Sequence, residues 1–308
     1  MIPTHGGWEL TESCLRHLAR QTVPHAVIVS DNGSPDRTPK RVRASFSDVG
    51  VVELGANLGF AVACNRGADA GTGEVVVLLN NDVDARPDFL ERLVTPLEVD
   101  ERVGSVAPLL VRPGGQVIDS VGLAADATLA GFARLAGRPV AEAASPRPVL
   151  VGPSGGAAAY RRTAWEDAGG LDEGVFSYLE DLDLALRLRA AGWSAAAAPD
   201  AVGVHLGSAT MGRRSARQRR QGGFARGYFL RRYGVLRNRV APRALAAEAV
   251  VIVADAILSR DLAALRGRLA GWRAAAGKPV WPRPPSDALD PDIGFLESLR
   301  LRRETYGN

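Results

Sequence analysis

Short apolar runs alternate with helical patterns over the first 110 residues of the chain. Three runs are rich in β-branched residues and end in polar turns, which predicts strands at 26–30, 51–54 and 74–79. Helical patterns separate them, at 8–20, 37–46, 60–70 and 87–99. Buried strands that alternate with helices indicate a parallel sheet covered on both faces. Ligands of such sheets bind beyond the carboxyl ends of the strands, so the polar clusters at 31–34 and 80–84 are expected to border a crevice.

The second half of the chain changes character. Residues 103–160 contain several strand candidates joined by loops rich in Gly, Pro and Ala. A helix is expected from Leu179 to Ala191, and a last short strand from Ala201 to His205. From residue 213 onward the pattern is helical. We therefore predict an α/β domain over residues 1–205 and a helical extension over residues 206–308.

Composition limits the class of protein. The 308 residues are 46% hydrophobic and 23% charged, which is typical of a globular protein and excludes wholesale disorder. Cys14 and Cys64 are the only cysteines, so neither a disulfide framework nor a cysteine-based zinc site is expected, and a reducing, cytoplasmic compartment fits best. The start of the chain lacks the pattern of a signal peptide, and the apolar run at 249–254 is too short to span a membrane.

Charge is unevenly distributed along the chain. Residues 1–205 carry 18 Lys and Arg against 26 Asp and Glu, whereas residues 206–308 carry 20 against 8. The basic run Arg213–Arg220 is the densest part of this extension, and aromatic residues follow it. Three interpretations stay open: a solvated arginine-rich helix, a surface for an anionic membrane, and a nucleic-acid-binding segment.

Four clusters of polar residues can carry chemistry. They lie at 2–6 with 31–34, at 57–67, at 80–84, and at 169–183 with His205. Each alone has a plain structural explanation: a turn, a capping loop, a solvated helix start, or a buried structural histidine. Asp183 is expected to pair with Arg187, one helical turn further on.

Taken together and in this order, the clusters resemble the family-two inverting glycosyltransferases with the GT-A fold, especially the rhamnosyltransferase-like branch. The resemblance runs from residue 2 to about residue 240. It implies a Rossmann-like mixed sheet flanked by helices, followed here by the arginine-rich helical extension.

The resemblance also implies roles for individual residues. Asp181, in the pair with Glu180, matches the general base, and Asp82 with His205 matches the site for Mg²⁺ or Mn²⁺. The nucleotide-sugar is expected to contact the remaining set, which comprises Thr4, Asp31, Asn32, Asn57, Asn65, Asn81 and Gly155.

General chemistry supports these roles. A divalent cation can neutralise a nucleoside diphosphate leaving group, and a carboxylate can accept the proton of the acceptor hydroxyl. A carboxylate in the first turn of a helix is stabilised by the helix dipole, as expected for Asp181.

Two features depart from the family pattern. Asn80 stands where the metal signature usually has an acidic residue, which removes one negative charge, and Asp84 is a candidate substitute ligand. An apolar strand normally precedes the motif Ile2–Thr4, so we expect the natural chain to begin further upstream.

We therefore expect an enzyme that transfers a sugar, with rhamnose first, from a dTDP-, UDP- or GDP-linked donor to a polysaccharide or a lipid-linked glycan. Because related enzymes act on lipid-linked acceptors, docking to the inner face of the cell membrane ranks first for the basic extension. An inactive scaffold is the alternative function, and a nucleic-acid partner ranks last.

Overall fold

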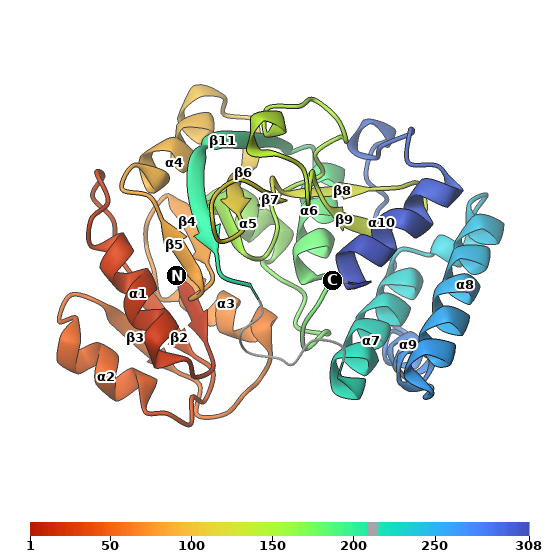
Figure 1. Cartoon of the computed structure of the whole chain (residues 1–308), viewed down its shortest axis with the longest axis horizontal. Coiled ribbons are helices and arrows are strands. Elements are labelled where there is room, and N and C mark those ends of the chain that lie inside the picture. The colour runs from red at the N-terminus through yellow and green to blue at the C-terminus, as the bar shows by residue number, and fades with distance from the viewer. Residues whose placement is uncertain (208–214, 308) are drawn as a thin grey trace.

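The computed structural model describes residues 1–207 and 215–307, with side chains through Arg302. The chain forms an α/β body whose strands are flanked by helices, and a block of helices lies beside it (Figure 1). The predicted class, a mixed sheet with a helical C-terminal extension, is confirmed. Arg213 and Arg214, in the basic run of the sequence analysis, lie outside the described residues.

The first sheet is parallel, as the alternating pattern predicts. Its order is β1 (Ile2–Thr4), β2 (Ile28–Asp31) and β3 (Gly50–Glu53). The connecting helices lie within a few residues of the predicted ones: α1 (Trp8–Leu18), α2 (Thr38–Ser45) and α3 (Phe60–Asp69). The three carboxyl ends of these strands therefore meet at one edge.

The second sheet is mixed. Its order is β4 (Val75–Leu79), β10 (Ala157–Arg161), β6 (Val103–Val111), β11 (Ser194–His205) and β5 (Val83–Ala85), and β7 (Ile118–Ser120) pairs with β6. β10 runs antiparallel to both neighbours, whereas β11 runs parallel to β6. All nine residues of β6 are buried, so this strand lies at the centre of the body.

Backbone hydrogen bonds of Met1 join the two sheets. Its amino group donates to the Val77 carbonyl at 2.6 Å, and Leu79 N–H donates to the Met1 carbonyl at 3.1 Å. Ile2–Thr4 itself is thus the strand between β2 and β4.

Shorter elements complete the body. They are α4 (Phe89–Val99), α5 (Arg162–Ala168), α6 (Glu180–Ala190), the hairpin β8 (Leu123–Ala125) with β9 (Gly131–Ala133), and the 3₁₀ turn Val140–Glu142. α6 packs against the helical block, because Leu182 and Leu186 share one core cluster with Phe229 and Tyr233.

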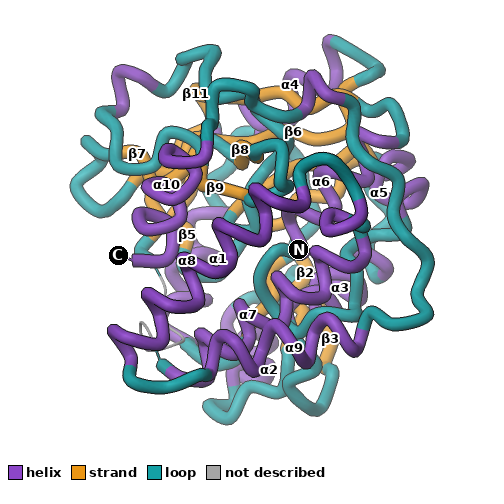
Figure 2. The backbone as a smooth tube through the Cα atoms, turned by 90° about the vertical axis from the view of Figure 1, so that its right-hand side faces the viewer, coloured by secondary structure: helices purple, strands orange, loops and turns teal. Residues whose placement is uncertain are grey.

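The helical block consists of α7 (Ala216–Arg232), α8 (Ala241–Ser259), α9 (Ala263–Ala274) and α10 (Phe295–Gly307), with 3₁₀ turns at Val235–Arg237 and Ser286–Ala288. The right-hand side of Figure 1 faces the viewer in Figure 2, so α8 lies in front there. No helix in the described part of the chain is long and apolar enough to cross a membrane.

Many arginines of this block are internal rather than solvated. Arg226, Arg268 and Arg302 converge on the buried carboxylate of Glu248 at 2.9, 2.8 and 2.7 Å. Burial alone would raise the pKa of Glu248, but the three guanidinium groups outweigh it and hold this pKa far below its ordinary value. These three arginines therefore belong to the internal structure of the helical block rather than to its surface charge.

Candidate active site

Three strand ends and one helix start meet beyond the sheet. Asn80 N–H donates to the Gly156 carbonyl at 2.9 Å, which joins the end of β4 to the start of β10. Leu206 N–H donates to the Asp82 carbonyl at 2.9 Å, which adds the end of β11. Gly155 then connects this group to α6, because its N–H donates to Asp181 Oδ2 at 2.8 Å. The metal-site candidates and the base candidate therefore border one locus.

The backbone before α6 adopts an unusual conformation. Tyr178 and Leu179 both have left-handed φ values, 77° and 65°. Such conformations cost a bulky residue about 1–3 kcal/mol and persist where the surrounding structure enforces them. They turn the chain abruptly, so that the helix begins with Glu180 buried and Asp181 partly buried.

The two adjacent carboxylates differ in their hydrogen bonds. Asp181 Oδ2 accepts from Gly155 N–H, and its Oδ1 accepts from Leu182 N–H at 2.7 Å. Glu180 is 7% exposed, and its Oε2 forms no hydrogen bond to a described residue. Asp181 is thus held in a fixed orientation at the crevice.

Burial raises the pKa of both carboxyl groups. For Glu180, loss of hydration and the neighbouring Asp181 charge raise the pKa to about 8. For Asp181, loss of hydration raises the pKa, and the N–H groups of Gly155 and Leu182 counteract part of that change. Carboxyl groups with raised pKa values in a crevice are suited to proton transfer near neutral pH.

His205 lies between two carboxylates. Its Nδ1 is 2.7 Å from Asp119 Oδ2, and its Nε2 is 3.3 Å from Asp82 Oδ1. Burial opposes protonation of the imidazole, but these two contacts outweigh it and raise the pKa of His205 to about 10. Asp119 holds one ring nitrogen, and the other faces Asp82.

Asp82 and His205 have the chemistry of a site for a divalent cation. Asp82 Oδ1 is buried and faces His205 Nε2 at 3.3 Å, so a metal bound here would take the place of the proton on this ring nitrogen. Carboxylate oxygen and imidazole nitrogen together suit Mn²⁺. Over the described ranges, no group of three or more His, Cys, Asp or Glu could hold a metal, so a ligand's phosphate oxygens would have to complete the coordination.

Asp119 contacts the candidate metal ligand His205, and the sequence analysis did not identify it. It lies on the three-residue strand β7, 86 positions before His205. A histidine that ligates a metal usually donates its other ring N–H to a carboxylate, which fixes the tautomer and the ring orientation. No local motif marks Asp119, because its role depends on the pairing of β7 with β6.

Asp84 is not positioned to replace a ligand. It lies on β5, where its Oδ1 accepts from Ser13 at 2.8 Å and lies 3.2 Å from His17 Nδ1, both on α1. The expectation that Asp84 substitutes for the acidic residue missing at Asn80 is therefore wrong. A turn at Asn81 and Asp82 separates β4 from β5, and Asp84 on β5 faces α1.

The two carboxylate oxygens of Asp31 have different surroundings. Its Oδ2 accepts from Gly33 and Ser34 N–H at 3.2 and 3.1 Å. Its Oδ1 is buried and has no hydrogen-bond partner in the described protein. Gly33 is required here, because its φ is 73° and an added Cβ would lie 2.7 Å from the Ala56 carbonyl carbon. Asp31 thus presents an acceptor at the carboxyl end of β2.

Three of the predicted nucleotide contacts connect the surrounding loops. Asn32 Nδ2 donates to Asn57 Oδ1 and to the Gly59 carbonyl, both at 3.0 Å. Asn81 Nδ2 donates to Thr4 Oγ1 at 3.3 Å and to Thr11 Oγ1 at 3.0 Å. Asn32, Asn57 and Asn81 therefore shape the strand-end loops through their side chains.

Asn65 occupies a different environment. Its amide donates to the Leu171 carbonyl at 2.9 Å and to Glu173 Oε1 at 3.0 Å, and its Oδ1 accepts from Leu171 N–H. This side chain ties α3 to the segment that precedes the carboxylate pair.

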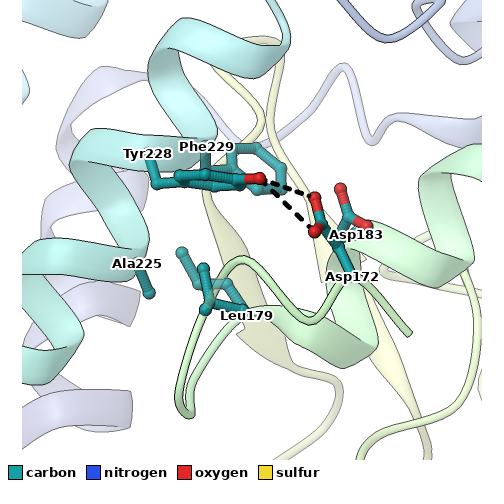
Figure 3. Close-up of a pocket in the computed structure, with 7 residues that line it drawn as sticks. Asp172, Leu179, Asp183, Ala225, Tyr228 and Phe229 are labelled. Carbon is teal, nitrogen blue, oxygen red and sulfur yellow. Dashed lines mark hydrogen bonds between the residues drawn. The ribbon is translucent and has the colours of Figure 1, made fainter. Parts of the chain in front are cut away.

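The helical block also contacts that segment. Tyr228 Oη on α7 donates to Asp172 Oδ2 at 3.0 Å, and Figure 3 shows the tyrosine ring directed at this carboxylate above Leu179. Tyr233 Oη donates to Asp183 Oδ1 at 2.9 Å. Asp183 pairs with Arg187 at 2.8 Å, which confirms that prediction.

Comparison with known proteins places this chain in a family. The model described as "Glycosyl transferase family 2" matches residues 1–169. The N-acetylglucosaminyl-diphospho-decaprenol L-rhamnosyltransferase of Mycobacterium tuberculosis (strain ATCC 25618 / H37Rv) is 32% identical over 215 residues, which is 62% of this chain and 69% of that protein. The glucosyl-dolichyl phosphate glucuronosyltransferase of Haloferax volcanii is 31% identical over 104 residues, 33% of this chain and 31% of that protein.

Solved structures share the fold. The mannosyltransferase PcManGT from Pyrobaculum calidifontis, in complex with GDP-Man and Mn²⁺, aligns with a TM-score of 0.51 and 24% identity over 91% of this chain and 86% of that chain. S. aureus TarS 1-349 in complex with UDP aligns with a TM-score of 0.53 and 14% identity over 89% of each chain. This chain therefore belongs to glycosyl transferase family 2 and is a glycosyltransferase with the GT-A fold.

Proposed function

We propose that this enzyme transfers a sugar, with inversion and with a divalent cation, from a nucleotide-sugar to a hydroxyl group of a lipid-linked glycan. The observation that carries the proposal is Asp181, a partly buried carboxylate fixed by two backbone N–H groups beside the Asp82–His205 pair. Rhamnose on a dTDP carrier is the first donor to test, followed by UDP- and GDP-sugars. The 32% identical relative named as a decaprenol-linked rhamnosyltransferase supports this order.

Each residue has a task in this reaction. The free Oδ1 of Asp31 would accept a hydrogen bond from the nucleoside, and Thr4 lies beside it at the end of β1. Asp82 and His205 would hold Mg²⁺ or Mn²⁺, which neutralises charge on the departing diphosphate. Asp181 would accept the proton of the acceptor hydroxyl as the oxygen attacks the sugar carbon, while the bond to the diphosphate breaks on the opposite side.

Glu180 has a supporting task. Because its pKa is raised, Glu180 stays largely protonated over much of the neutral range, so that Asp181 is not adjacent to a second full negative charge. Gly155 fixes Asp181 through its N–H, and the same loop continues into Gly156 beside His205.

The setting follows from the acceptor. A lipid-linked glycan is presented at a membrane, so we place the enzyme in the cytoplasm at the inner face of the cell membrane. Nucleic acid has less support as a partner, because many arginines of the helical block bind the protein's own carboxylates.

The test is release of nucleoside diphosphate from a panel of dTDP-, UDP- and GDP-sugars with Mn²⁺ or Mg²⁺ and a lipid-linked acceptor. We expect Asp181→Asn to reduce transfer by about 10²–10⁴-fold, because it removes the base. Nucleotide binding, measured by calorimetry, should change less than about threefold, because Asp181 lies on the acceptor side.

Asp84→Asn is the matched control, because this acidic residue lies near the metal candidates yet faces α1. It should retain transfer. Wild-type turnover in Asp181→Asn would refute the base assignment. Failure of every donor to react with the wild-type protein would favour the inactive scaffold instead.

A further inference from the structure

α8 has a reversed distribution of polarity. Nine of its residues are exposed, and none of them is polar or charged: Pro242, Leu245, Ala246, Ala249, Val250, Val253, Ala254, Ile257 and Leu258. They recur every three or four positions and so line one face of the helix. Surface helices normally expose the opposite, polar face to water.

The charged residues of α8 all bind other parts of the protein. Glu248 receives the three arginines described above, Arg243 lies 3.3 Å from Asp126 Oδ2, and Asp255 lies 3.3 Å from Arg219. The inward face therefore satisfies its charges by pairing. α8 therefore has charged residues, but none of them lies on its outward face.

The apolar face is long and exposed. From Pro242 to Leu258 it extends about 24 Å at 1.5 Å per residue. Val253, Ile257 and Leu258 are 56%, 71% and 80% exposed. Figure 1 shows α8 at the outer edge of the molecule, on the side opposite the β1–β2–β3 sheet. Contiguous exposed apolar surface of this kind marks a site of interaction.

Exposed arginines lie at both ends of this face. Arg239 lies two residues before the first residue of α8, and Arg260 follows directly after its last residue. The nearby acids do not offset them, because Asp255 and Asp261 both pair with Arg219. An apolar stripe bounded by cations matches the boundary between acyl chains and anionic headgroups.

A second copy of the chain fits this pattern less well. If two α8 faces paired antiparallel, Arg239 of one copy would lie beside Arg260 of the other. If they paired parallel, each arginine would meet its own equivalent. Either arrangement brings like charges together at both ends of the contact, which weakens association.

We propose that α8 lies in the plane of an anionic lipid bilayer, with Val250, Val253 and Ile257 inserted below the headgroups and Arg239 and Arg260 at the phosphates. That a membrane is the partner rests on the proposed function, because a lipid-linked acceptor lies in a membrane. That α8 is the surface which binds it rests on the exposed residues of α8 alone. α8 lies on the bilayer and does not cross it, since its charged inward face stays packed on α7, α9 and α10.

The experiment measures co-sedimentation of the full chain with vesicles made of equal parts phosphatidylcholine and phosphatidylglycerol. Val253→Gln with Ile257→Gln should lower the partition coefficient more than about tenfold, because both apolar contacts are lost. Glutamine keeps the helix and adds no charge. Val99→Gln with Leu296→Gln is the matched control, because these side chains are 81% and 79% exposed on other helices and should leave binding unchanged.

A charge variant tests the second element of the proposal. Arg239→Gln with Arg260→Gln should weaken binding to the anionic vesicles severalfold and leave binding to pure phosphatidylcholine vesicles unchanged. Unchanged circular dichroism would show that each variant is folded.

Two results would overturn the proposal. One is a wild-type chain that fails to bind the anionic vesicles. The other is a dimer in sedimentation velocity without lipid that Val253→Gln with Ile257→Gln dissociates, because the stripe would then be an interface between copies. Donor hydrolysis in solution should be the same in every variant, so failure here leaves the proposed catalytic function unaffected, and the reverse also holds.

Discussion

His205 is held by one carboxylate that the sequence motifs identify and by one that they do not. Two residues separate Asp82 from the end of an apolar strand, so its place at the sheet edge is predictable. Asp119 reaches His205 only because β7 pairs with β6 and β11 lies on the other side of β6. Strand pairing over such separations is not encoded in a local pattern, which is why the second partner of the histidine was missed.

We predict that Asp119→Asn lowers the pKa of His205 well below about 10, because it removes the negative charge nearest to Nδ1. The affinity for Mn²⁺, measured from the Mn²⁺ dependence of donor hydrolysis, should also fall by about 10–100-fold, because the imidazole loses its orientation. An NMR titration of His205 without metal and a Mn²⁺ titration of turnover check the two effects. Asp88→Asn, an exposed acid paired with Arg92, is the control. An unaltered His205 titration would contradict the assigned role.

Glu180 makes stability depend on pH. Its pKa is raised in the folded state to about 8, so both states bind its proton below about pH 4.5 and the folded state alone keeps it at higher pH. Stability is therefore complete at low pH and declines as pH rises toward 8. We predict that Glu180→Gln, which cannot ionise, gains in Tm over the wild-type protein between pH 5 and pH 8. At pH 8, the free energy of unfolding of the variant should exceed that of the wild-type protein by on the order of a few kcal/mol. Parallel Tm curves for the two proteins would show that Glu180 is not so perturbed.

The crossing of α7 and α9 is set by glycines on both helices. On α7, an added Cβ would overlap a carbonyl oxygen of α9: that of Ala264 for Gly223, and that of Arg268 for Gly227. On α9, it would overlap a carbonyl oxygen of α7: that of Arg220 for Gly267, and that of Phe224 for Gly271. Spacing of four residues on each helix allows the backbones to touch. The sequence analysis predicted helices here, but it had no means of pairing these two glycine pairs.

We predict that Gly227→Ala destabilises the protein by at least about 2 kcal/mol, because α7 and α9 must move apart. Gly222→Ala is an internal control on the same helix. No atom lies within 4 Å of its added Cβ, so the change should stabilise by about 0.5–1 kcal/mol through helix propensity. Urea denaturation measures both. Equal effects of the two substitutions would show that the crossing tolerates a methyl group.

Local patterns predicted elements whose periodicity is strong and misjudged one strand that lacks it. The strands at 28–31, 50–53 and 75–79 lie where β-branched runs end in polar turns. β11 extends from Ser194 to His205, whereas only its last residues, from Ala201, were predicted. Its first part contains four consecutive alanines, which favour a helix intrinsically. Pairing with the buried strand β6 overrides that preference.

The helical block and the α/β body share side chains across the predicted boundary at residue 205. Tyr233 donates to Asp183 beside the catalytic candidates, and Arg226 donates to the carbonyl of Leu129 at 2.8 Å. Asp290 accepts from Val149 N–H at 2.6 Å. The division of the chain at that residue stays a prediction, and these contacts cross it at several points.

We predict that the protein unfolds in a single transition in calorimetry, because the contacts across residue 205 are buried and couple the two parts. Tyr233→Phe should lower the Tm by a few degrees without splitting the transition, since it removes about 1 kcal/mol of hydrogen bonding. Its aromatic contact with Phe229 is retained. Two resolved transitions in the wild-type protein would mean that the body and the block are independent units.

The convergence of three arginines on Glu248 also constrains how the gene can change. Loss of the carboxylate alone leaves three arginines, two of them buried, without a carboxylate partner, and loss of one arginine alone removes only one contact of three. Arginines can therefore be replaced one at a time, whereas Glu248 can become apolar only after all three have been replaced. Among homologues, we expect positions 226, 268 and 302 to vary in the presence of an acidic residue at 248, and an apolar residue at 248 to occur only where all three are neutral.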